Sequence, residues 1–169
     1  ENTVREKNLI LYTAYNHRFE PHIIRMKEII ESGVLGKLYF CKIFYGNGTA
    51  KLVKDSFWRD EEEGVLKDLG SHLLDTTNYL FSSRYQFEII AECAFENNSA
   101  DYVVAHSKNI QLRIELGMTF CMWKNSFICE VVGEKGSAHI ESLCKWGPST
   151  LTIRKRIFPS GVPTEKSEI

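Results

Sequence analysis

The 169-residue sequence has no excess of charge of either sign and no long apolar run. Lys and Arg number 21, Asp and Glu number 22, and the formal net charge is −1. Because a nucleic-acid backbone and an anionic membrane both call for a net basic partner, this balance argues against either one. No segment approaches the roughly 18 apolar residues that a membrane span requires. The remaining composition, 43% hydrophobic and 25% charged, predicts one folded, soluble domain.

The sequence also has no closely spaced cysteine pair. None of its five cysteines forms the CxxC pattern of zinc knuckles or redox proteins, and we predict no metal site. They lie in apolar stretches such as Phe40-Cys41-Lys42-Ile43, where free cysteine behaves as a small hydrophobic residue. We therefore expect buried free thiols in a reducing compartment and a cytoplasmic protein. The cysteines are Cys41, Cys93, Cys121, Cys129 and Cys144.

The first part of the chain shows strand and helix signals in turn. Residues 9–15 form a short apolar run rich in strand formers, which predicts a buried strand. Pro21 predicts the start of a helix, because its missing N–H would be unpaired at that position, and Gly33 predicts the end. Residues 38–45 predict a second strand.

The rest of the chain predicts one more helix and then a series of strands. A polar loop over residues 46–64, long enough to be functional, precedes a helix over 65–81. Residues 110–116 alternate apolar and polar, which is typical of a half-buried antiparallel strand. Helices followed by strands predict an α+β fold, an open, largely antiparallel sheet with helices packed on one face. Other strands are expected at residues 87–96, 101–106, 127–132, 136–143 and 150–158, before a polar tail.

Four polar side chains recur at helical spacing within the second predicted helix. Asp68, His72, Asp75 and Tyr79 lie along one helical stripe. Such a stripe is most often the solvated face of an amphipathic helix. Two features favour a functional site instead. A carboxylate lies one turn from an imidazole that can exchange a proton near neutral pH. In addition, Gly70 costs the helix about 1 kcal/mol, which indicates close approach of another part of the backbone or a ligand.

Several short motifs follow one another in a fixed order along the chain. They are Tyr15-Asn16-x-Arg18-Phe19-x-Pro21, Gly33-x-x-Gly36, Trp58-Arg59, Gly64-Val-Leu-x-Asp68-Leu-Gly70-Ser71-His72-x-x-Asp75 and Val132-Gly133-x-x-Gly136-Ser137-Ala138. In order and spacing, this series resembles the Gfo/Idh/MocA family, the relatives of glucose–fructose oxidoreductase and inositol dehydrogenase. The resemblance extends from about residue 9 to residue 145.

The resemblance implies a division of the chain. Family members have an N-terminal Rossmann domain followed by an α/β domain with an open sheet. By this comparison, residues 1–19 are a remnant of the last helix and strand of a Rossmann domain, residues 20–160 form the substrate-binding and oligomerisation domain, and residues 161–169 are a tail. The sequence has no GxGxxG fingerprint and lacks the family's Glu-Lys-Pro motif. NAD or NADP would therefore be bound mainly by a domain absent from this chain.

The resemblance also implies roles for individual residues. Asp68 and His72 match the family's catalytic pair at a sugar-like or polyol substrate. His72 would take the hydroxyl proton as hydride leaves the neighbouring carbon, while Asp68 orients the substrate or the imidazole. Lys67 lies in the same motif but is expected to point away. The pair Glu62-Glu63 stands where the family often has glycines, which argues against a phosphorylated ligand.

Four more residues are implied around this pair. Asn16 and Arg18 fall where the family approaches its cofactor, although a plain strand-to-helix turn would explain them equally well. Trp58 and Arg59 fall in a loop that contacts substrate in the family, although a surface stacking pair is the alternative.

Three classes of function stay open at this point. The first is an NAD(P)-dependent oxidoreductase of a sugar, cyclitol or similar polyol, with this chain as its substrate-binding half. The second is a catalytically silent fragment or scaffold that acts in oligomerisation or ligand binding. The third is an NAD-dependent glycoside hydrolase. A homo-oligomer through the sheet face is expected from the resemblance, and Gln111, Arg113 and Glu115 would make that face rather polar.

Overall fold

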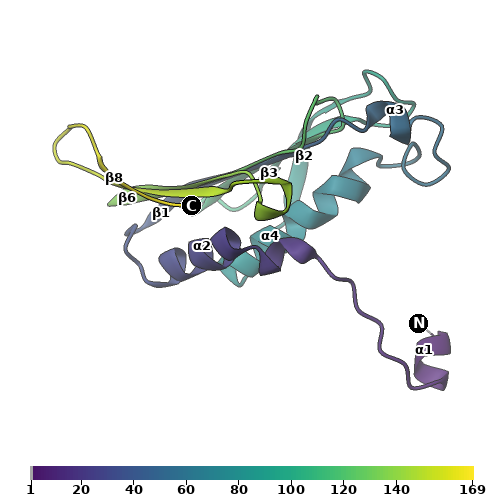
Figure 1. Cartoon of the computed structure of the whole chain (residues 1–169), viewed down its shortest axis with the longest axis horizontal. Coiled ribbons are helices and arrows are strands. Elements are labelled where there is room, and N and C mark those ends of the chain that lie inside the picture. Colours follow the sequence, from purple (N-terminus) through teal and green to yellow (C-terminus); the bar gives the residue numbers. More distant parts are fainter. Residues whose placement is uncertain (1) are drawn as a thin grey trace.

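The computed structural model describes residues 2–169, and its body is one sheet of eight strands (Figure 1). The strand order is β2-β3-β4-β1-β5-β6-β7-β8. Six of the seven neighbouring pairs are antiparallel, and only β1 and β4 run parallel. The strands are β1 (Leu38–Gly46), β2 (Phe87–Cys93), β3 (Tyr102–Ser107), β4 (Arg113–Thr119), β5 (Ser126–Gly133), β6 (Gly136–Glu141), β7 (Thr150–Lys155) and β8 (Thr164–Glu168). The predicted largely antiparallel sheet is confirmed.

Alternating side chains on the central strands divide the sheet into a buried and a solvated face. On β4, Ile114, Leu116 and Met118 are at most 1% exposed. The intervening Glu115 faces the opposite side, as the alternation predicts. The strand lies slightly later than expected, because the alternation begins at Ile110, which is 95% exposed and precedes β4.

Two helices cover the buried face of the sheet (Figure 1). The first is α2 (Pro21–Glu31), which begins at the predicted proline, and the second is α4 (Ser71–Phe81). A π turn, η2 (Leu66–Gly70), leads directly into α4. The short elements are α1 (Asn2–Glu6), η1 (Asn16–Phe19), α3 (Ala50–Val53) and η3 (Cys144–Trp146). None of the described helices is long and apolar enough to cross a membrane.

The predicted strand over residues 9–15 is wrong. These residues carry no strand and run as an extended segment away from the sheet (Figure 1). Ile10 is 97% exposed and Leu11 is 68% exposed. A strand needs a neighbour to accept and donate its backbone hydrogen bonds, and no described strand pairs with this segment.

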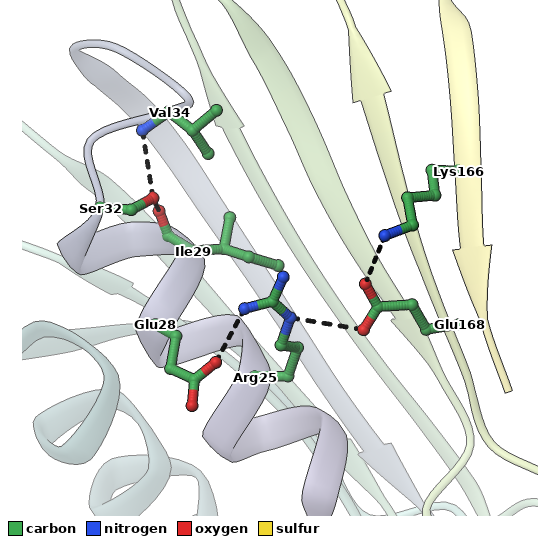
Figure 2. A network of polar contacts seen from close by, with 7 residues as sticks. All are labelled: Arg25, Glu28, Ile29, Ser32, Val34, Lys166 and Glu168. Atoms are coloured by element: carbon green, nitrogen blue, oxygen red, sulfur yellow. Dashed lines mark hydrogen bonds and ion pairs between the residues drawn. The ribbon is translucent and has the colours of Figure 1, made fainter.

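The predicted polar tail is wrong as well, because residues 164–168 form β8 and pair antiparallel with β7. Side chains join this edge strand to α2 (Figure 2). Arg25 donates to Glu28 at 2.8 Å and to Glu168 at 3.3 Å, and Lys166 lies 3.5 Å from the second Glu168 oxygen. Polar residues suit an exposed edge strand, so their composition resembles that of a tail.

The five cysteines are free, as predicted. Cys41 and Cys129 are fully buried on neighbouring strands β1 and β5, whereas Cys144 is exposed. The expectation of buried thiols is therefore right for the two central residues and wrong for Cys144.

Candidate active site

A cleft of about 440 Å³ opens where the N-terminal segment, the loop before α4 and the first turn of α4 meet. This size falls within the usual range for a small-molecule site. One wall is the backbone and side chains of residues 13–16, and the other is the segment around Asp68. The lining residues are Thr13, Ala14, Tyr15, Asn16, Trp58, Lys67, Asp68, Ser71 and His72.

A π turn presents Asp68 to the cleft. The turn spans Leu66–Gly70, and π turns inserted before or within α-helices are frequently found at functional sites. Gly70 lies so close to the sheet that an added Cβ would come within 2.9 Å of Met118 Sδ on β4. The neighbours of Gly70 are side-chain ends, Met118 Sδ from the sheet and Leu66 Cδ1 from the same turn, so the structure shows side-chain packing at this position instead of the close approach of a backbone or ligand.

Arg59 holds the carboxylate of Asp68. Its Nη2 lies 2.8 Å and its Nε 2.9 Å from Asp68 Oδ2. The guanidinium also lies 5.6 Å from the ring centre of Trp58 and 5.4 Å from that of Phe120. Among the hydrogen bonds of the described residues, those to the Asp68 side chain come from Arg59 and not from His72. Asp68 therefore pairs with Arg59, and not with the His72 side chain that the resemblance implied as its partner.

Three aromatic rings surround the imidazole of His72. His17 stacks on it with ring centres 4.8 Å apart and an interplanar angle of 30°. Tyr15 and Tyr45 approach edge-on, at 5.9 Å and 6.2 Å. Within residues 2–169, the buried Nδ1 atom of His72 has no hydrogen-bond partner. The ring is therefore held by its aromatic contacts.

Burial and a nearby cation keep His72 uncharged. Burial lowers the pKa of His72 below its usual 6.5, and Lys145 lowers it further, while Asp68 and Asp75 partly oppose the shift. Burial also lowers the pKa of His17, to about 3, with Lys145 and His72 adding to the effect. Both imidazoles are therefore neutral at pH 7, and a neutral imidazole can accept a proton.

The predicted cofactor pair, Asn16 and Arg18, separates in the structure. Asn16 lines the cleft, whereas Arg18 is outside the lining and binds Asp75. Arg18 Nε donates to Asp75 Oδ2 at 2.6 Å, and Arg18 Nη2 donates to Asp75 Oδ1. The same ion pair shows that the polar stripe of α4 is not a solvated face, because Asp75 is only 8% exposed.

The charged rim of the cleft differs from the expectation for Lys67. This side chain lines the cleft instead of pointing away from it, and its Nζ lies 2.9 Å from Glu62 Oε2. Glu62, which sits in the left-handed region at φ 51°, is joined to the rim through this ion pair. The three consecutive glutamates thus contribute negative potential beside the site, while Glu62 is paired with Lys67.

Sequence reasoning missed His17, Tyr45 and Lys145. His17 occupies the unassigned position between Asn16 and Arg18, and nothing in its spacing marks it as buried. Tyr45 comes from β1 and Lys145 from η3, so both reach His72 only through the tertiary fold. Within residues 2–169, no cluster of three or more His, Cys, Asp or Glu side chains could hold a metal ion.

Residues 23–139 match the family model described as the GFO/IDH/MocA C-terminal domain. Over 82 residues, 46% of this chain and 23% of the relative, the chain is 31% identical to glucose-6-phosphate 3-dehydrogenase of Bacillus subtilis (strain 168). Over 79 residues, 45% of this chain and 22% of the relative, it is 30% identical to scyllo-inositol 2-dehydrogenase (NADP(+)) IolW of the same organism.

Solved structures share the fold over almost the whole chain. A levoglucosan dehydrogenase in complex with NADH is similar with a TM-score of 0.77 and 17% identity, over 99% of this chain and 49% of that one. An NAD binding oxidoreductase from Klebsiella pneumoniae is similar with a TM-score of 0.77 and 16% identity, over 98% of this chain and 48% of that one. The chain thus spans about half the length of these proteins.

Proposed function

Because this chain belongs to the Gfo/Idh/MocA family, we propose that it is the substrate-binding half of an NAD(P)-dependent oxidoreductase acting on a sugar, cyclitol or similar polyol. The named relatives are dehydrogenases of a sugar phosphate and of an inositol. The observation that carries the proposal for this chain is the neutral imidazole of His72 in the wall of a cleft, beside the carboxylate of Asp68.

His72 is the proposed proton acceptor. In the oxidative direction, the imidazole takes the proton of the substrate hydroxyl, and the resulting positive charge is stabilised by Asp68 and Asp75, which already favour the charged form. Arg59 keeps the Asp68 carboxylate at the cleft wall, where it can accept a hydrogen bond from a second hydroxyl. The half-exposed ring of Trp58 offers an apolar surface to one face of a sugar ring.

The coenzyme, when bound, accepts or supplies the hydride. The described residues offer it only a contact surface, because they contain no glycine-rich turn for a pyrophosphate. Asn16 is the proposed contact, since it lines the cleft. We assign Arg18 to the support of this turn through Asp75 and no longer to direct coenzyme binding.

The domain division follows the same proposal. The exposed apolar side chains of Leu9, Ile10 and Leu11 would pack on a Rossmann domain, with residues 1–19 as its remnant and residues 20–160 as the substrate domain. A homo-oligomer through the solvated sheet face remains part of the proposal, and Ile128 at 48% exposure lies on that face beside charged neighbours. A cytoplasmic location is the corresponding expectation.

Coenzyme titration tests the proposal. NAD(H) and NADP(H) would be titrated into this chain and into the chain extended by whatever coding sequence precedes it. We expect binding and polyol-dependent turnover by the extended protein only. Binding by neither protein would favour the silent scaffold, and release of a sugar from a glycoside without net oxidation would favour the hydrolase.

Substitution of His72 tests the proton transfer. In the extended protein, His72→Asn is expected to lower kcat by about 10² to 10⁴, the usual contribution of a general base. His22→Asn is the matched control, because His22 lies on α2, bonds Ser149 at 2.8 Å and does not line the cleft. Equal turnover by the His72 variant and the unmodified protein would contradict the assignment.

A further inference from the structure

His17 is a buried histidine that the proposed reaction does not use. It lies in the η1 turn and is 1% exposed, and neither of its ring nitrogens has a hydrogen-bond partner within the described residues. A buried polar ring without partners is unusual, because burial removes its hydrogen bonds to water and no protein hydrogen bonds replace them. Within the described residues, His17 instead makes its contacts through its aromatic ring.

The ring of His17 is fixed from the side of the sheet. Tyr45 on β1 lies 5.2 Å away and Phe127 on β5 lies 5.4 Å away, measured between ring centres. These two residues are register partners on adjacent antiparallel strands, so their relative position is set by the backbone ladder. His17 thus rests on one of the most constrained parts of the fold.

The His17 ring also contacts the ring of His72. Its ring is the one that stacks on His72, with 30° between the planes, whereas Tyr15 and Tyr45 stand at 88° and 80° to it. Edge contacts limit the sideways movement of a ring, but a face contact sets its plane. Removing the His17 ring would leave space into which the His72 imidazole could tilt.

We propose that His17 is a positioning residue, which anchors the His72 ring to the sheet and so fixes the plane in which His72 meets a hydroxyl in the cleft. The anchoring is a property of this chain by itself. Its consequence for turnover rests on the proposed function, so the two are tested separately.

The anchoring is tested by NMR on this chain. In the unmodified chain, we expect nuclear Overhauser contacts from the His72 ring to Tyr15 and Tyr45, and His17→Phe, which keeps an aromatic face, should preserve them. His17→Leu should weaken them at least severalfold, and His17→Met, which fills the space flexibly without a ring, should do the same if the leucine variant does not fold. Phe81→Leu, at the far end of α4, is the control. Unchanged contacts in a folded variant without the His17 ring would overturn the proposal.

The catalytic consequence is tested in the extended protein. We expect His17→Leu to lower kcat by about ten- to a hundredfold, as small misplacements of a reacting group do, with little change in KM. His17→Phe should restore most of kcat. Full activity of His17→Leu would overturn the catalytic part. If the extended protein shows no polyol turnover at all, the proposed function fails, and the NMR result still decides the anchoring.

Discussion

Asp60 gives the sharpest stability prediction, because five donors converge on its carboxylate. Oδ1 accepts from Asn98 N at 2.8 Å, Ser99 N at 2.9 Å and Ser99 Oγ at 3.1 Å. Oδ2 accepts from Asp55 N and Asn98 Nδ2, both at 2.9 Å. The residue is 5% exposed, and it joins the long loop that carries Arg59 to the loop before β3. Asp60 thus holds the loop that carries Arg59 against residues 98 and 99.

The change Asp60→Asn removes two of these five hydrogen bonds. If the amide oxygen keeps the three donors on one side, its NH2 group meets two donors on the other, and two buried hydrogen bonds are lost. At about 1 to 1.5 kcal/mol each, the loss in unfolding free energy is about 2 to 3 kcal/mol. For a domain of this size, Tm should fall by about 5 to 10 °C. Asp55→Asn is the control, since it removes the same charge from an exposed side chain and should cost less than about 0.5 kcal/mol.

The effect of Asp60→Asn should also depend on pH. Burial by itself would raise the pKa of Asp60, but the hydrogen bonds from Ser99, Asp55 and Asn98 outweigh it and lower the pKa below the usual 3.8. A carboxylate with a depressed folded-state pKa contributes stability that is complete above its unfolded-state pKa and is lost as the pH falls through the folded-state value. Urea unfolding followed by circular dichroism between pH 2.5 and 7 measures this. A gap between the two proteins that stays constant below about pH 4, or is absent at pH 7, would refute the reasoning.

Three further experiments have defined expected outcomes. The side chains of the ion pair Arg18 and Asp75 are 38% and 9% exposed, so its strength should lie between those of exposed and buried pairs. A double-mutant cycle with Arg18→Met and Asp75→Asn, measured without coenzyme, should give a coupling free energy of about 1 to 2 kcal/mol. A coupling of zero would favour a direct role of Arg18 in coenzyme binding. Lys145→Met removes a charge that lowers the pKa of His72, so the NMR titration of His72 should move to higher pH, and an unchanged or lower midpoint would contradict the assignment. Gly64→Ala should lower the free energy of unfolding by more than about 1 kcal/mol, because a φ of 48° is unfavourable for alanine and its Cβ would lie 2.3 Å from the carbonyl oxygen of Ala100. Thermal unfolding measures this, and equal stability of the two proteins would show that the loop can shift freely.

Hydrophobic periodicity was sufficient for most of the fold. The alternation that leads into β4 and the apolar segment that becomes β1 are local signals, and Pro21 marked the start of α2. The same signal failed at both ends of the chain. Residues 9–15 have the composition of a strand but no neighbour to pair with, whereas residues 164–168 have the composition of a tail and pair with β7. A strand forms only beside a neighbouring strand, and the composition of a segment does not indicate whether such a neighbour is present.

The candidate site was predictable only where its residues lie close in sequence. Asp68 and His72 share a cleft wall, as the resemblance and the helical spacing both implied. The stacked His17 could not be foreseen, because its burial depends on Tyr45 and Phe127, which come from two strands of the sheet. Contacts of this kind are long-range, and a single sequence carries no record of them.

The polar stripe of α4 shows how one irregular turn changes such a prediction. Continuous α-helical spacing puts Asp68, Asp75 and Tyr79 on one line, but the π turn over residues 66–70 inserts extra length, and each added residue rotates the preceding side chains by about 100°. Asp68 accordingly meets Arg59 at the cleft, while Asp75 meets Arg18 on the side of η1. Two carboxylates that would otherwise compete for the same surroundings are thereby separated, each with its own arginine. Both carboxylates favour the charged form of His72, but burial and Lys145 outweigh them and lower its pKa, so the imidazole is held in the neutral form that can accept a proton.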